Sequence, residues 1–415
     1  MKLARRPSGV ARDYRALSAS KRWRNALHAL VRGLAKHLVL GNKHIGRTGY
    51  RTPLRTWAAL PTALTALLFV QTVFGHGCIA VSGGGFCPLD LGIGLTQESG
   101  YLQPGDWRAF GIYRWFRSDR HFIGDDEFTL PNERDHEAIN EAHYFELNLQ
   151  RALTERVSVA LIVPFVLYTR STVHEHQFTG RYKTSASGLG DMRLTAYYWL
   201  IDPSEDPKGN LALGFGPKFP TGEFDAKDTF YTYDGPVGLP VDQSIQPGDG
   251  GWGFSLELDA FYRLSETLNG YLQGYYLFNP GNTNGVDTLI GDRNPYEAVN
   301  SISDQYVSRL GLAYAVYPKW GLTLGLGGRI EGVPVRDAIG GSDGFRRPGY
   351  AVFIEPSLNI AKNEWNFTLE VPVAVYRNRL QSVADQKLSD LTGIYIHGDA
   401  AFADYLVTAS LSYKF

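Results

Sequence analysis

Cysteine and methionine are almost absent from this chain of 415 residues, which contains two of each. So few cysteines exclude a multi-disulfide scaffold and a cysteine-rich zinc domain. Beyond residue 77 there is also no run of 18 apolar residues, which excludes membrane-spanning helices from that part. Glycine and aromatic residues are abundant instead, with 46 Gly, 24 Tyr, 22 Phe and 8 Trp. This composition is typical of short β-strands joined by glycine-rich turns.

The formal net charge of −1 is the sum of two unlike parts of the chain. Residues 1–77 hold 14 Lys and Arg and a single acid, Asp13. The rest therefore carries 41 − 14 = 27 basic and 42 − 1 = 41 acidic residues, a net charge of 27 − 41 = −14. A chain this acidic repels polyanions, so we expect no nucleic-acid partner.

The basic N-terminal part ends like an export signal. An apolar run from Trp57 to Phe74 is followed by Gly75-His76-Gly77, which places small residues three and one before Cys78. This pattern predicts a cleavable signal peptide within residues 1–77. A transmembrane anchor is the alternative, although the run is short and interrupted. Residues 1–55 are long for the basic start of a signal, so either translation begins at a non-Met codon nearer Arg47 or Arg51, or the chain has a disordered basic extension.

Residues 78–105 are predicted to form a periplasmic N-terminal segment. Cys78 and Cys87 enclose the glycines of residues 83–85, in a compartment that permits disulfides. A disulfide between them is expected to restrict the unfolded chain near its end. Lipid attachment to Cys78 is the alternative, but a lipoprotein signal usually has a leucine-like residue at the position of Gly75.

Alternation of apolar and polar residues is the main pattern after residue 105. From Trp252 to Leu264 every second residue is apolar, whereas Glu257, Asp259 and Arg263 lie on the other face. A soluble sandwich would bury the apolar face as its core. Aromatic residues at the ends of such segments favour a lipid-facing band between two interfacial girdles.

Twelve alternating segments can be counted, and short and long connections alternate between them. The segments begin near Trp107, Glu141, Val157, Asp191, Leu211, Trp252, Leu268, Gln305, Trp320, Tyr350, Trp365 and Tyr405. The long connections are expected at 118–140, 171–187, 222–251, 281–304, 336–349 and 380–404. The pattern predicts an all-β fold over residues 106–415, a transmembrane antiparallel β-barrel of about twelve strands in the outer membrane. Short turns would face the periplasm and long loops the outside.

The final segment ends on an aromatic residue. Its outward face is predicted to consist of Tyr405, Val407, Ala409, Leu411, Tyr413 and Phe415. This alternation resembles the C-terminal strand that the barrel-assembly machinery recognises, so we expect that machinery and outer-membrane lipids to be partners.

Charged residues of both signs occupy the faces predicted to line the lumen. They are Glu146, Arg193, Glu257, Asp259, Arg263, Arg309, Arg329, Glu331, Glu355 and Glu370. In a barrel narrower than a porin they are expected to form an ion-pair network across the lumen. The alternative is a solvated wall that tolerates charge.

Catalytic and metal sites are not supported by the sequence. His143 shares a face with Phe145, and no serine and third residue complete a triad with it, so we interpret it as a rim residue. His174-Glu175-His176 offers two imidazoles in a loop, which we interpret as solvent-exposed. We therefore predict no catalytic residue, cofactor or metal.

Several glycine- and proline-containing stretches, taken together and in order, resemble a known family. They include Ser187-Gly188-Leu189-Gly190-Asp191, Lys218-Phe219-Pro220-Thr221-Gly222 and Gln246-Pro247-Gly248-Asp249-Gly250. This pattern resembles the outer-membrane family named for a MetA pathway of phenol degradation. The resemblance implies a channel for passive passage of small hydrophobic or aromatic compounds. The alternatives are a barrel enzyme acting on lipids and a plugged structural or surface-interaction barrel. Asp191 is expected either to face the lumen or to cap nearby backbone N–H groups.

Overall fold

The fold was analysed in a computed structural model, which describes residues 101–128, 137–205, 208–289 and 294–415. The predicted leader, Cys78 and Cys87 lie outside these residues. None of the helices in the described ranges is both long and apolar enough to span a membrane.

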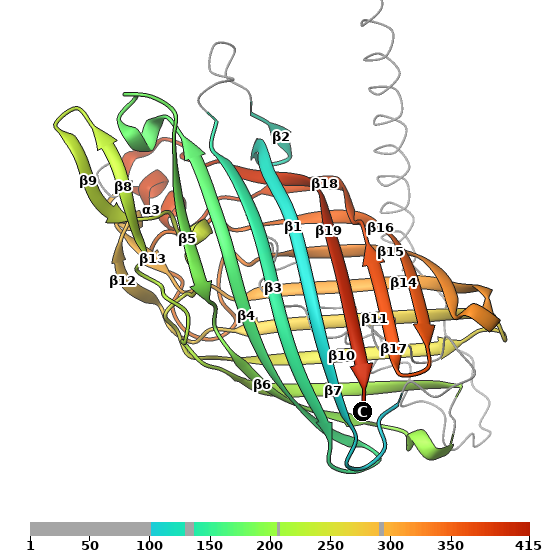
Figure 1. The fold of residues 1–415 in the computed structure, drawn as a ribbon. Helices are drawn as coiled ribbons and strands as arrows, with labels where there is room; N and C mark the ends of the chain where they lie inside the picture. Colours follow the sequence, from blue (N-terminus) through green and yellow to red (C-terminus); the bar gives the residue numbers. More distant parts are fainter. Residues whose placement is uncertain (1–100, 129–136, 206–207, 290–293) are drawn as a thin grey trace, which may run out of the picture. The chain divides into compact units, whose positions relative to one another are not determined.

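The wall is a closed antiparallel barrel of twelve strands, two of which are interrupted (Figure 1). In the order of their pairing they are β1 (Trp107–Ile123), β3 (Ile139–Ala152), β4 (Val157–Thr172), β5 (Tyr182–Leu189) with β6 (Arg193–Trp199), β7 (Gly209–Lys218), β10 (Gly253–Arg263), β11 (Leu268–Phe278), β14 (Gln305–Tyr317), β15 (Leu322–Val333), β16 (Gly349–Lys362), β17 (Trp365–Glu370) with β18 (Val373–Arg379), and β19 (Ala400–Lys414). The predicted fold class is confirmed.

The barrel closes between the first and last strands. Their register runs from Arg108 opposite Lys414 to Phe122 opposite Ala400. At the end, the N–H of Trp107 donates to the carbonyl of Phe415 over 2.8 Å, and the reverse bond measures 2.9 Å. Closure leaves no open sheet edge for lipid, which cannot satisfy backbone N–H and C=O groups.

The two faces of the wall differ in the way that a membrane requires. Outward apolar side chains such as Leu147, Phe215 and Leu310 are about three-fifths exposed. Alternate residues on the same strands point inward and are buried, and many of them are polar. Aromatic residues such as Trp320 and Trp365 lie exposed near strand ends. An apolar outer band with a polar interior is the signature of an outer-membrane barrel, so this is the protein's location.

The strand formed by β5 and β6 corrects one predicted boundary. We expected it to begin near Asp191 after a loop over 171–187, but it begins at Tyr182. Its outer half was missed because Lys183, Ser185 and Ser187 place polar groups on the outward face. The strand is interrupted at residues 190–192, where β4 changes partner from β6 to β5.

The outer loops contain more secondary structure than the sequence suggested. They hold β2 (Asp126–Glu127), η1 (His174–His176), β8 (Lys227–Thr232), β9 (Gly235–Pro240), η3 (Gln243–Ile245), β12 (Thr283–Asp287), η4 (Pro295–Glu297), β13 (Val299–Ser301) and α3 (Val383–Thr392), while η2 (Pro203–Glu205) and η5 (Pro318–Trp320) lie in the short turns. In Figure 1 the β8–β9 hairpin and α3 lie at the end of the barrel opposite the end of β19. The long loops therefore gather at one end.

The barrel interior holds buried apolar clusters. One includes Ile245 of η3 together with Phe116, Tyr144 and Val166 from the wall. A second, nearer the short turns, joins Tyr101 to Phe110, Ala160, Tyr197 and Phe261. The lumen is thus packed at these levels by side chains and by a loop that folds inward.

Candidate functional site

Three glycines from the family-like stretches meet inside the barrel. A Cβ atom on Gly222 would lie 2.8 Å from the Cα of Gly248, and one on Gly248 would lie 2.7 Å from the carbonyl oxygen of Gly222. A Cβ on Gly190 would lie 3.0 Å from Cγ of Pro164. Backbones approach too closely here for a side chain, which explains why glycine occupies these positions.

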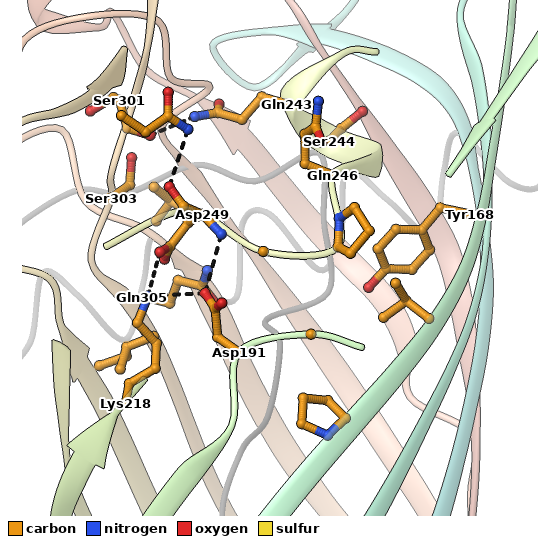
Figure 2. Close-up of a pocket in the computed structure, with 18 of the residues that line it drawn as sticks. Tyr168, Asp191, Lys218, Gln243, Ser244, Gln246, Asp249, Ser301, Ser303 and Gln305 are labelled. Carbon is orange, nitrogen blue, oxygen red and sulfur yellow. Dashed lines mark hydrogen bonds and ion pairs between the residues drawn. The ribbon is translucent and has the colours of Figure 1, made fainter. Parts of the chain in front are cut away.

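Asp191 ties the same three stretches together. Its Oδ1 accepts the N–H of Gly222 over 3.0 Å, and its Oδ2 accepts the N–H of Asp249 over 3.1 Å. Lys218 places Nζ 3.2 Å from Asp191 and also pairs with Asp249. Figure 2 shows these three side chains in one connected cluster. Both roles considered for Asp191 are observed, because it caps backbone N–H groups and also lines a cavity in the lumen.

Residues 241–249, here called the crossing segment, pass through the lumen between β9 and β10. Asp242 receives two hydrogen bonds from Arg347, of 2.7 and 2.6 Å. Although burial opposes ionisation, Arg170 and Arg347 hold the pKa of Asp242 well below its ordinary value. The side chain of Gln246 bonds both the N–H and the carbonyl of Ala226, over 2.9 and 3.2 Å. The segment is therefore fixed by polar contacts at several points.

A cavity of about 120 Å³ lies beside the crossing segment (Figure 2). Its apolar wall consists of Tyr144, Pro164, Val166, Tyr168, Leu277 and Val333. Its polar wall includes Ser301, Ser303 and Gln305 together with residues of the crossing segment. Because Leu277 and Val333 lie at the outer ends of their strands, the cavity is on the outer side of the lumen.

Five of the predicted lumen charges form one buried cluster. Arg309 Nη1 lies 3.0 Å from Oε1 of Glu370 and 3.9 Å from Oε1 of Glu355. Arg329 bonds Glu331 through Nε over 2.9 Å and lies 3.4 Å from Glu355. All five side chains are at most 5% exposed, so water is excluded from most of their surface.

A second cluster surrounds Arg193. Its guanidinium lies 3.3 Å from Glu146 and 3.9 Å from Glu257. The hydroxyl of Tyr144 donates to Glu146 over 2.6 Å, and that of Tyr197 to Glu257 over 2.7 Å. The structure thus brings eight of the ten predicted residues into two groups of contacts.

The remaining two predicted charges, Asp259 and Arg263, lie on the inward face of β10. Asp259 is buried and Arg263 is partly exposed nearer the short turns. Our list of lumen charges missed Arg114, which is buried, with its guanidinium 5.7 Å from the ring centre of Tyr144. Arg114 lies between Phe110 and Phe116 at the same spacing of two, on the face of β1 that points inward. This spacing was a sufficient signal to place Arg114 in the lumen.

His143 and the final strand lie as the alternation predicts. The hydroxyl of Tyr113 is 2.9 Å from Nδ1 of His143, in a partly buried contact on the outward face. On β19, Tyr405, Leu411 and Tyr413 are exposed, as is Phe415 directly after the strand, whereas Leu406 is buried inside. A role of this strand in assembly stays a prediction.

In the stretch His174-Glu175-His176 the side chain of Glu175 is only 5% exposed and pairs with Arg170, and the interpretation of this stretch as solvent-exposed is also wrong for His176. Its ring is fully buried, stacked at 5.3 Å on Phe230, and its Nδ1 accepts the N–H of Tyr231 over 3.0 Å. Burial lowers the pKa of His176. The β8–β9 hairpin folds over the loop, which the local sequence did not reveal. Across the described ranges, no group of three or more potential metal ligands occurs.

Residues 138–334 match the model of a family described as "Putative MetA-pathway of phenol degradation". No curated protein matches the chain. Among solved structures, the COG4313 outer membrane channel from Pseudomonas putida F1 is 15% identical, with a TM-score of 0.47, over 76% of this chain and 97% of that one. The P. putida toluene transporter TodX is 10% identical, with a TM-score of 0.38, over 81% and 99%.

Proposed function

We propose that this barrel is an outer-membrane channel for passive passage of small hydrophobic or aromatic compounds. The match of residues 138–334 to the family described as "Putative MetA-pathway of phenol degradation" supports this proposal. The observation that carries the proposal is the cavity beside the crossing segment. It presents Val166, Leu277 and Val333 to the outer side of a lumen whose next layer consists of paired charges. An apolar wall of this kind holds apolar solutes by removing their surface from water.

We propose that the buried ion pairs control which solutes can pass through the lumen. Arg309, Arg329 and their glutamates lie deeper in the barrel than Leu277 and Val333, and they leave little surface to water. We propose that this layer acts as a barrier to water and ions, while solutes are collected above it. A solute that follows the barrel axis must displace some of these side chains.

Uptake of a radiolabelled monoaromatic hydrocarbon tests the proposal in cells that lack the chromosomal gene and carry a plasmid copy. Val166→Trp should fill the cavity and abolish most of the uptake that the wild-type copy restores. Leu310→Trp, on the outward face, is the matched control and should leave uptake intact. Equal uptake by Val166→Trp and wild type, at equal amounts of folded barrel, would refute the proposal.

A barrel enzyme acting on lipids is the alternative that the same protein can test. Purified barrel is incubated with labelled phospholipid, with and without His143→Ala. Phospholipid turnover that His143→Ala abolishes would refute the channel proposal and support an enzyme. General leakiness to hydrophilic solutes on expression would instead indicate an open porin.

A further inference from the structure

We infer that a groove in the lipid-facing side of the wall, centred on Gly111, binds one phospholipid of the periplasmic leaflet. One acyl chain of the lipid fills the groove, and the phosphate of the same molecule pairs with Arg151 at the membrane interface. The site lies on the side of the wall that faces away from the lumen, so it does not depend on the proposed channel.

The groove crosses the seam at which the barrel closes. It is an open hollow of about 510 Å³, formed by residues of β17, β19, β1, β3 and β4. These five strands are neighbours in the wall, and Figure 1 shows β1, β3 and β19 side by side. Its surface is almost entirely apolar. A molecule that occupies it therefore touches both the first and the last strand of the barrel.

Two small residues create the hollow. Gly111 is exposed, and a Cβ atom added to it would meet no other atom within 4 Å. In the strand register Gly111 lies between two exposed leucines, Leu147 on β3 and Leu411 on β19. Ala409, the next outward residue on β19, also lines the groove. The wall is thus low at Gly111 and Ala409 and higher on both sides.

An acyl chain is the occupant that such a groove fits. Lipid tails are as apolar as leucine side chains, so no hydrophobic driving force separates one apolar occupant from another. What the groove offers is van der Waals contact on several sides, which would be lost if it stayed empty. A flexible chain can follow the groove and make these contacts without rearrangement of the wall.

Arg151 supplies a positive charge for the lipid phosphate. It is exposed near the short-turn end of β3, and its guanidinium lies 5.1 Å from the ring centre of Trp107. It forms no ion pair with any residue that the structure describes. Trp365, Tyr413 and Phe415 are exposed at the same end of the wall, which marks the level of the membrane interface. A phosphate at this level meets a cation that is free to bind it.

The groove and Arg151 are within reach of one lipid molecule. Leu147 and Arg151 are four residues apart on β3, which corresponds to roughly 13 Å along the strand. A strand tilt of about 40° reduces this to roughly 10 Å of depth. Each half of the hydrocarbon core is about 15 Å thick, so a chain that starts near Arg151 reaches the groove. A phospholipid carries both groups in one molecule, which favours it over a separate anion and a separate chain.

Native mass spectrometry of the purified, delipidated barrel tests the inference, with phosphatidylethanolamine as the probe. Wild type should bind one molecule more tightly than any further lipid. Gly111→Leu fills the groove and should weaken this first binding by about 5- to 30-fold, the loss of roughly ten carbon–carbon contacts. Gly274→Leu is the matched control on the lipid-facing side of β11, where an added Cβ would meet only Leu258, at 3.8 Å. It should leave the binding unchanged.

Arg151→Gln tests the contact with the phosphate, and diacylglycerol serves as a second probe that lacks this group. The substitution should weaken binding of phosphatidylethanolamine by about 2- to 5-fold, the range for an exposed charge pair, and leave diacylglycerol unchanged. Lys319→Gln is the matched control, because Lys319 is an exposed cation next to Trp320 and lies outside the groove. It should alter binding of neither probe.

Three outcomes would overturn the inference. Equal binding of phosphatidylethanolamine by wild type and Gly111→Leu would exclude the groove as the site. An Arg151→Gln effect of the same size on both probes would exclude the phosphate contact. A wild-type dimer that Gly111→Leu dissociates would assign the groove to a second copy of the chain. None of these results bears on uptake through the lumen, so the proposed function is tested separately.

Discussion

Arg329→Ala should open and destabilise the barrel, because the guanidinium of Arg329 is fully buried between two carboxylates. It bonds Glu331 over 2.9 Å and lies 3.4 Å from Glu355. Removing one partner of a buried ion pair costs about 3 to 5 kcal/mol, since the charges left behind are neither paired nor hydrated. Arg117→Ala breaks an exposed pair with Asp119 and should cost about 0 to 1 kcal/mol.

Two assays check this expectation. Urea unfolding in lipid vesicles measures the free energy of unfolding for wild type, Arg329→Ala and the control Arg117→Ala. Recordings in planar bilayers should show small or rare conductance for wild type, and larger or more frequent conductance for Arg329→Ala. Glu257→Ala should also raise conductance, because Glu257 is bonded to Tyr197 and faces Arg193. Large, steady wild-type conductance that neither substitution changes would refute the ion-pair barrier.

Four further predictions concern other parts of the chain. Deletion of Phe415 should lower the amount of heat-modifiable folded barrel, because this residue ends the closing strand; normal folded yield with lost uptake would contradict the assembly role. Gly222→Ala should destabilise by about 1 to 3 kcal/mol in urea unfolding, because its Cβ would lie 2.8 Å from Gly248, whereas Gly238→Ala, which meets nothing within 4 Å, should be nearly neutral. Burial and the charge of Asp385, partly offset by Arg379 and Arg347, raise the pKa of Glu297 to about 7. The folded outer loops should therefore lose about 3 kcal/mol as pH rises from about 4.5 through 7, so that protease nicking near α3, corrected for protease activity, increases from pH 5 to pH 8 in wild type but not in Glu297→Gln. N-terminal sequencing of outer-membrane material should give a mature chain that begins at or near Cys78; peptides from residues 1–55 would contradict this, and an added acyl mass would favour the lipoprotein alternative.

The wall could be predicted because a barrel in lipid constrains every residue of a strand. Lipid requires apolar side chains on the outside and the lumen accepts polar ones, so most of β10 and β15 alternates between apolar and polar residues. The constraint ends where the wall leaves the lipid. That is why the outer half of the β5–β6 strand, with Lys183 and Ser185 outward, was mistaken for a loop.

The lumen residues could be named, but their partners could not. Alternation places Arg309 and Glu370 inside, whereas their separation of 3.0 Å depends on how the strands are staggered around the barrel. The crossing segment was beyond prediction for a similar reason. Asp242 and Arg347 are 105 positions apart, and nothing local to either residue shows that they meet.

The arrangement of charge and apolar surface supports one coherent function. A lumen lined with unpaired charges of one sign would conduct counter-ions. An entirely apolar lumen would not be hydrated favourably and would tend to collapse. Here Arg309 and Arg329 are paired with three buried glutamates, and we propose that this pairing restricts the passage of water. The cavity lies on the outer side of these ion pairs and offers an apolar surface next to polar residues of the crossing segment. A small neutral molecule is the solute that gains from the cavity without having to break the ion pairs that surround it.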